Sequence, residues 1–187
     1  MKIFIPLLII SILGSCSSRV YTYSIVLEKP QKSNNLNFEN DTMSISFDFI
    51  EKGITFKLYN KTEDGIKINW DELSMSVNGK AQRVLHKETG SYKITDVQPP
   101  TTIPPKTVLE DGIIPSDIVS YSNIGGRTII NLNALYPKYD YGDKRKRAEI
   151  MNMKGQKIVI FLPYYIRNIY HSKIFEFLIT DIIAKKG

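Results

Sequence analysis

Alternating apolar and polar residues predict β-strands in the first half of the chain. Between residues 43 and 49 every second side chain is apolar, and the same period of two recurs over residues 54–58 and 66–70. This period places one face of a strand in a core and the other in water. Residues 20–27 also favour a strand, because they are rich in valine, tyrosine, threonine and isoleucine.

Short turn signals separate these strands. Asn78-Gly79 predicts a hairpin with residues 81–85 as its return strand, because both central positions of such a turn need a positive φ. Glu51-Lys52-Gly53, Asp64-Gly65 and Gly125-Gly126 predict further turns.

Two polar or proline-rich segments interrupt the strands. Residues 29–41 are rich in asparagine, so we expect a loop there. Residues 99–105 contain four prolines, and proline lacks the amide hydrogen that a central strand donates. We therefore expect an extended crossover that packs along one edge of a sheet.

The C-terminal part predicts one helix and two long strands. Residues 143–153 form the helical window, with Asp143 as its N-cap and Gly155 as its stop. Residues 157–166 favour a strand. Residues 174–183 suit a strand or a helix by spacing alone, and their phenylalanine, isoleucine and threonine content favours the strand. Many short strands at intervals of roughly 8–12 residues predict an all-β antiparallel sandwich or barrel with at most one or two short helices.

The N-terminal segment predicts export. Lys2 precedes the apolar residues 3–13, and the small residues Gly14 and Ser15 precede Cys16, the single cysteine of the chain. This is the layout of a secretory signal, and the apolar run is shorter than the roughly 20 residues of a membrane-spanning helix.

The run Leu13-Gly14-Ser15-Cys16 resembles the lipobox of bacterial lipoproteins. The resemblance implies cleavage between Ser15 and Cys16 and attachment of acyl chains, such as palmitate, through the Cys16 thiol. Two or more acyl chains hold a protein stably on a membrane. The alternative is an ordinary secretory signal followed by a coincidental cysteine.

Lipid attachment defines the expected organisation of the chain. Residues 1–15 are the signal peptide, residues 16–18 the lipidated N-terminus and residues 19–187 a single domain. Neither an aspartate nor an acidic cluster follows Cys16, so the resemblance implies an outer membrane, on its periplasmic side. With Cys16 acylated, no thiol remains for a disulfide or a metal, and we expect no cofactor besides the covalent lipid.

A net charge of +6 suits a polyanionic partner. No nucleic-acid-binding motif accompanies this charge, and export is hard to reconcile with such a partner. We therefore expect contact with a membrane and with an envelope protein or anionic polymer, and no nucleic acid.

A longer stretch of sequence is similar to a group of uncharacterised bacterial lipoproteins. The matching stretches are residues 54–62 with their Phe-x-x-Tyr-Asn-Lys-Thr motif, residues 66–71, the hairpin Val77-Asn78-Gly79 and the proline-rich segment at residues 99–105. The resemblance covers residues 41–115 and implies an immunoglobulin-like sandwich without a known activity. Asn60 and Thr62 stand where a strand ends, and their side chains suit local bonds to the backbone.

Common enzyme signatures are absent from the sequence. Two histidines, His86 and His171, would need to converge with Asp96 or Glu110 to hold a metal or act as a base, and we favour unrelated histidines instead. Asp71 and Glu72 follow Trp70 directly, so they suit a tight turn better than a catalytic pair. We expect no metal site and no catalytic residue.

The best candidate for a binding surface lies just before and within the predicted helix. Tyrosines offer apolar area with a polar tip, and a basic cluster is attracted to an anionic surface. The residues of this candidate surface are Tyr136, Tyr139, Tyr141, Lys144, Arg145, Lys146 and Arg147.

The sequence thus favours a lipid-anchored, non-enzymatic binding or assembly module of the cell envelope. The alternatives are a small envelope hydrolase that acts on glycan or peptide, and a passive structural lipoprotein.

Overall fold

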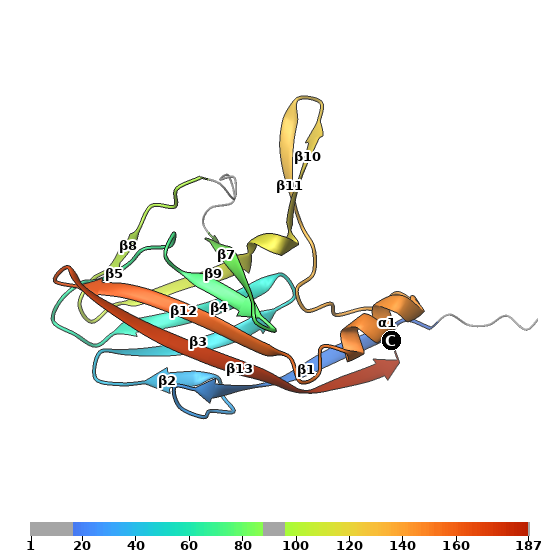
Figure 1. Cartoon of the computed structure of the whole chain (residues 1–187), viewed down its shortest axis with the longest axis horizontal. Helices are drawn as coiled ribbons and strands as arrows, with labels where there is room; N and C mark the ends of the chain where they lie inside the picture. Colours follow the sequence, from blue (N-terminus) through green and yellow to red (C-terminus); the bar gives the residue numbers. More distant parts are fainter. Residues whose placement is uncertain (1–16, 88–95, 187) are drawn as a thin grey trace, which may run out of the picture.

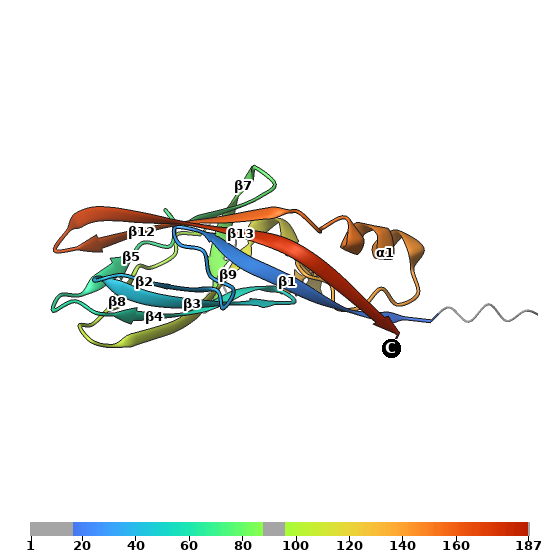
Figure 2. The same cartoon turned by 90° about the horizontal axis from the view of Figure 1, so that it is seen from below.

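Two layers of antiparallel strands form the body of the molecule (Figure 2). The computed structural model describes residues 17–87 and 96–186. The strands of the first layer are β1 (Arg19–Lys29), β5 (Ile66–Ile68), β6 (Ser74–Val77), β8 (Thr101–Ile103), β12 (Lys157–Ile166) and β13 (Ile169–Lys186). The strands of the second layer are β2 (Asn37–Glu39), β3 (Met43–Ile50), β4 (Gly53–Asn60) and β9 (Val108–Pro115).

The strand β7 (Lys80–His86) connects the two layers, because it pairs with β6 in the first and with β9 in the second. The hydrogen-bonded neighbours follow one another as β1-β13-β12-β6-β7-β9-β4-β3-β2, and β5 pairs with β12 and with β8. These pairs are all antiparallel. The predicted all-β antiparallel sandwich is confirmed.

The core lies between the layers and follows the period-two pattern of the sequence. Along β3 the odd-numbered Met43, Ile45 and Phe47 are buried, while the residues between them are not. Phe47 contacts Phe175 and Phe177 of β13, with ring centroids 4.9 and 5.0 Å apart and nearly perpendicular planes. Each such edge-to-face pair adds about 1 kcal/mol to the burial of the rings.

The predicted turns lie where the sequence placed them. Asn78 and Gly79 have φ of 50° and 79° and connect β6 to β7. Gly125 and Gly126, also with positive φ, connect β10 (Val119–Ile124) to β11 (Arg127–Leu132). Asn60 donates its side-chain amide to Asp64 O at 2.7 Å and accepts from Thr62 N–H at 2.9 Å, so its local structural role is confirmed.

The two C-terminal strands are confirmed, and the alternative of a helix at residues 174–183 is wrong. Phe175, Phe177 and Ile179 of β13 are fully buried at every second position. In a helix Phe177 would lie on the face opposite to Phe175 and Ile179, so only a strand places all three side chains on one side.

The prediction of a continuous loop over residues 29–41 is wrong at Asn37–Glu39, which form β2. Phe38, a lone apolar residue among asparagines, is buried against Phe175, with ring centroids 5.5 Å apart. This long-range contact explains a strand that the local composition does not favour. The proline-rich segment runs along an edge as expected, because among residues 17–87 and 96–186 the strand β8 pairs with β5 alone.

The helix α1 (Lys144–Met151) begins as predicted at its N-cap Asp143, whose carboxylate accepts the N–H of Arg145 at 2.8 Å. It ends at Met151, two residues before the predicted end. Among the described residues, no helix has the length and apolarity to cross a bilayer.

The β10–β11 hairpin stands away from the two layers (Figure 1). It follows the short 3-10 helix Ser116–Ile118, and Ile118 and Val119 pack with Leu85 at its base. Near its tip Ile124 is 64% exposed.

We predict that Gly53→Ala lowers the free energy of unfolding by about 3 kcal/mol, measured by urea denaturation. Gly53 has φ of 155°, and an added Cβ would lie 2.5 Å from Ile113 O of β9. Gly79→Ala is the matched control, because its φ is also positive but no atom lies within 4 Å of the added Cβ. We expect it to cost about 1 kcal/mol, and equal losses would contradict the steric explanation.

Candidate functional site

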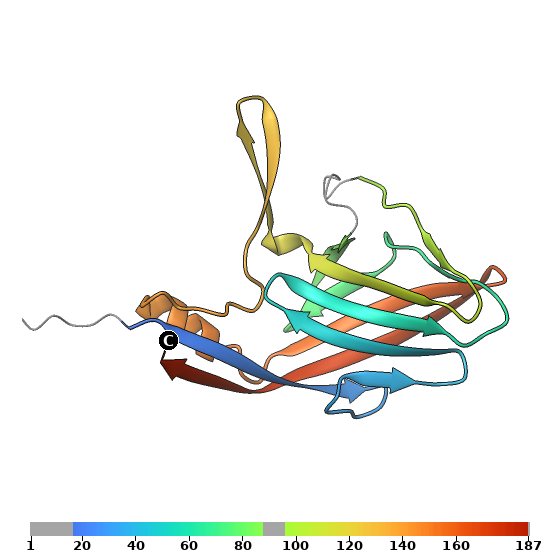
Figure 3. The same cartoon turned by 180° about the vertical axis from the view of Figure 1, so that it is seen from behind.

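The predicted binding surface lies at the end of the molecule where β1 begins, α1 packs and β13 ends (Figure 1, Figure 3). Lys138 O accepts the N–H of Tyr21 at 3.0 Å, and Asp140 N–H donates to Arg19 O at 3.4 Å. These bonds add residues 138–140 to the outer edge of β1, with Val20 opposite Tyr139.

A buried carboxylate holds this end together. The Asp140 side chain is 0% exposed and accepts four hydrogen bonds. Oδ1 accepts the N–H groups of Arg19 at 2.9 Å and Gly142 at 3.0 Å. Oδ2 accepts Tyr21 OH and Arg147 Nε, each at 2.9 Å.

These donors hold the pKa of Asp140 well below the ordinary value of an aspartate. The Gly142 N–H has the largest effect, followed by the N–H of Arg19 and the side chains of Arg147 and Tyr21, against the opposing effect of burial. A buried charge is tolerated only with such partners. The start of β1, the loop before α1 and α1 itself are therefore fixed to one another through a single side chain.

Six of the seven predicted surface residues face solvent at least in part, and five of these six take no part in the Asp140 site. Tyr141 is 72% exposed, and its ring lies 5.8 Å from that of the half-buried Tyr139. Lys146 Nζ lies 4.8 Å from the centroid of the Tyr141 ring, a cation–π arrangement. Lys144 and Arg145 are exposed.

The other two predicted residues have structural contacts. Tyr136 is a correction, because it is only 4% exposed and belongs to the core rather than to the surface. Its N–H donates to Glu51 O at 3.1 Å, which turns the side chain inward, and its ring packs on Phe49 at 5.4 Å. Arg147 is half-buried and its guanidinium pairs with Asp140.

Several charged residues at this end were not predicted from the sequence. Asp140 was not singled out, although an acid between two tyrosines was a visible signal. Lys138, which stands between Tyr136 and Tyr139, was not singled out either. The basic residues Arg19, Lys185 and Lys186 were missed because they come from distant parts of the chain, and Arg19 lies opposite Lys186 in the β1–β13 ladder.

Cys16 and Ser15, the predicted lipidation and cleavage residues, lie outside the described residues. The description begins at Ser17, directly after Cys16.

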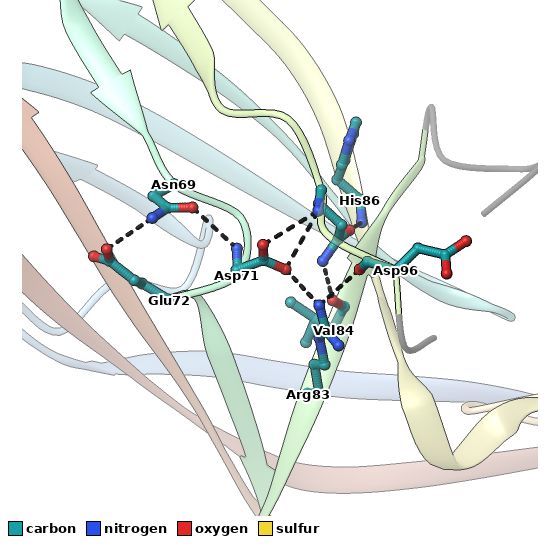
Figure 4. A network of polar contacts seen from close by, with 8 residues as sticks. Asn69, Asp71, Glu72, Arg83, Val84, His86 and Asp96 are labelled. Carbon is teal, nitrogen blue, oxygen red and sulfur yellow. Dashed lines mark hydrogen bonds and ion pairs between the residues drawn. The ribbon is translucent and has the colours of Figure 1, made fainter. Parts of the chain in front are cut away.

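A second polar network surrounds His86 (Figure 4). The ring of His86 stacks on Trp70 with centroids 4.6 Å apart, and Nδ1 lies 3.4 Å from Asp111 Oδ2. The His86 N–H donates to Gln98 Oε1 at 2.9 Å, and Gln98 Nε2 donates to Val84 O at 2.9 Å. Both ring and carboxylate are buried, so the arrangement holds the end of β7 against the core.

The adjacent acids Asp71 and Glu72 point to different partners (Figure 4). Asp71 forms an ion pair with Arg83, whereas Glu72 accepts from Asn69 Nδ2 at 2.7 Å and from Tyr165 OH at 2.9 Å. These contacts confirm a tight turn after Trp70.

The two histidines have separate surroundings. His171 stacks on Tyr164 of β12, with centroids 5.3 Å apart, and Glu110 pairs with Lys57 rather than with either histidine. Within the part of the chain that the structure describes, no three His, Cys, Asp or Glu side chains are arranged to hold a metal ion.

No protein-family model matches the chain, and neither a curated protein nor a solved structure gives a match. The resemblance to uncharacterised lipoproteins therefore stays a prediction.

We predict that Asp140→Asn lowers stability at neutral pH and flattens its dependence on acid. The Asp140 pKa is lower in the folded than in the unfolded state, so folding favours the ionised form. Its contribution is complete above the ordinary pKa of about 4 and is lost as the pH falls below it. Urea unfolding between pH 7 and pH 2.5 measures both effects.

Asp143→Asn is the matched control, because asparagine is an equally good N-cap and Asp143 is exposed. A similar loss in both variants, or a parallel pH dependence of Asp140→Asn and the parent, would contradict the central role of Asp140.

Proposed function

We propose that this protein is a lipid-anchored cell-envelope protein that acts as a non-enzymatic binding or assembly module. In this proposal acyl chains on Cys16 attach it to a membrane, expected to be the periplasmic side of an outer membrane. The basic, tyrosine-bearing end of the fold would then face the lipid headgroups.

The observation that carries the proposal is the position of Arg19. It stands three residues after Cys16 in the sequence, and Asp140 fixes its backbone beside α1. Three extended residues span about 10 Å, which is close to the Debye length at physiological salt. A lipid on Cys16 would therefore keep the charges of α1 within effective range of a bilayer surface.

The side chains at this end suit an anionic interface. Tyr139 and Tyr141 combine apolar rings with hydroxyl groups, as side chains at membrane interfaces do. Each exposed lysine or arginine near an anionic surface contributes about 1 kcal/mol. The basic residues at this end are Arg19, Lys138, Lys144, Arg145, Lys146, Arg147, Lys185 and Lys186.

The hydrolase alternative depended on a histidine that meets two acids. His86 instead lies beside Asp111 and is stacked on Trp70 in the interior. We therefore retain the binding module as the proposal.

We expect Cys16→Ser to release the protein from membrane fractions or to leave it unprocessed. Loss of the thiol removes the acceptor for the acyl chains, which stably anchor a protein when two or more are present. Fractionation and mass spectrometry of the mature N-terminus measure both outcomes. A variant that is processed normally and still sediments with membranes would contradict lipid attachment.

We predict that charge reversal at Lys144 and Arg145 weakens the electrostatic part of membrane contact. In the Cys16→Ser protein, the double change to glutamate is expected to lower partitioning onto phosphatidylethanolamine–phosphatidylglycerol vesicles at least tenfold, at about 1 kcal/mol per removed charge. The matched control is Lys32→Glu with Lys80→Glu, two exposed lysines outside this end. An equal loss in both double variants would show a net-charge effect and contradict a localised surface.

A further inference from the structure

A seam remains between the two ends of the strand order, β1 and the β2–β3 pair. It contains a cleft of about 560 Å³. At one end residues 33–36 cross from one strand to the other. Ser33 and Leu27 exchange two backbone hydrogen bonds of 2.9 Å, and Leu36 O accepts the N–H of Phe47 at 3.1 Å.

At the other end residues 135–138 make the second crossing. Glu51 O, just after β3, accepts the N–H groups of Leu135 at 2.8 Å and Tyr136 at 3.1 Å, and Lys138 O accepts from Tyr21 of β1. Backbone segments therefore surround the cleft, and we call this border the frame. It consists of β1, residues 33–36, β3 and residues 135–138. Between Tyr21 and Leu27 the frame is about 20 Å long, which is the length of about six residues of an extended strand.

The edge of β1 is unpaired inside this frame. The N–H groups of Tyr21 and Leu27 point away from β13, because they bond to the two crossing segments. Alternation along the strand gives Tyr23 and Ile25 the same direction. In the described residues, only the bridges at Val20 and Leu27 meet this edge.

The opposite wall has an unpaired edge as well. On β3 the N–H of Phe47 points away from β4, since it bonds to Leu36 O. Phe49 lies two residues further along the strand, so its N–H points in the same direction. The pairing of β2 with β3 stops at Ser46. Both walls of the cleft thus present backbone donors and acceptors, the groups that pair with an extended peptide.

The floor of the cleft contains a buried hydroxyl group. Within the described part of the chain Tyr136 OH has no hydrogen-bond partner, and Tyr136 lines the cleft beside Tyr23 and Phe49. Burial raises the pKa of Tyr136, so the hydroxyl keeps its proton and is a donor. A buried unpaired hydroxyl destabilises a fold and requires an explanation.

The rim of the cleft is acidic. Asp48 and Glu51 line it, and neither has an ion-pair partner among the described residues. Lys138, also at the rim, lies with its Nζ 6.0 Å from the Tyr139 ring. The carboxylates of Asp48 and Glu51 favour an occupant with basic side chains.

We propose that the seam between β1 and β3 binds a short extended segment of a partner protein, in which apolar side chains alternate with basic ones. The segment pairs with the free edges of Tyr23, Ile25 and Phe49. Its apolar side chains enter the aromatic floor and its basic side chains meet Asp48 and Glu51. Binding turns the Tyr136 ring, whose hydroxyl is buried in this structure, so that its OH donates to a backbone carbonyl of the segment. The inference rests on the binding-module part of the proposed function and not on the lipid.

The test uses the full chain with Cys16→Ser, so that failure of lipid attachment does not affect the result. The probe is acetyl-Val-Lys-Val-Lys-Val-amide, compared with the same peptide N-methylated at its valines and with a peptide that has glutamate for lysine. We expect the parent peptide to slow amide hydrogen exchange at Tyr23, Ile25 and Phe49. Loss of the peptide N–H groups or reversal of its charge is expected to weaken binding at least fivefold.

The Tyr136→Phe variant distinguishes the role of the hydroxyl group in peptide binding from its effect on stability. The variant keeps the ring and removes only the orphan hydroxyl, so we expect greater stability to urea together with about fivefold weaker peptide binding. Phe161→Tyr at the half-buried β12 surface is a control that leaves the seam intact and is expected to bind like the parent.

Three results would overturn the proposal. They are equal binding of the N-methylated peptide, unchanged binding to Tyr136→Phe, and protection at the seam by dodecanoate but not by the peptide. The last outcome would assign the cleft to an acyl chain instead of a protein segment.

Discussion

The buried charge of Asp140 is the constraint on which the arrangement of this protein depends. A carboxylate taken out of water needs several hydrogen bonds, and its donors come from β1, from the loop before α1 and from α1. Arg19 and Tyr21 are separated from Asp140 by 121 and 119 residues. One side chain therefore joins the beginning of the described chain to its last third. It also places the basic residues of α1 near residue 17, where the described chain begins.

The same junction shapes the seam. Residues 135–138 cross from β3 to β1 directly before Asp140, so the bonds that hold Asp140 also hold one end of the cleft. Native sheets usually cover or charge their edges, whereas the edge of β1 at Tyr23 and Ile25 faces an open, aromatic space here. The proposed membrane-facing end and the proposed peptide seam are thus neighbours, and a partner in the seam would be held near the bilayer.

The polar network around His86 shows why residue type alone is a poor guide to chemistry. The histidines of the sequence raised a reactive site as the less favoured alternative, but the ring of His86 is stacked on Trp70 and its amide is bonded to Gln98. Such a network specifies one packing of β7. The contacts of His86 and Gln98 therefore have a structural role in the fold.

Local physics determined what the sequence could show. Alternation in residues 43–49, the Asn78-Gly79 turn and the Asp143 cap each depend on neighbouring residues, so strands, hairpin and helix start were predictable. Tyr136, Tyr139 and Tyr141 look alike in the sequence, and only the tertiary structure decided that the first is buried. Its orientation depends on Glu51, the charge of Asp140 depends on Arg19, and the open edge of β1 depends on where β3 ends. Contacts between residues so far apart arise only when the two layers close, and no local pattern encodes them.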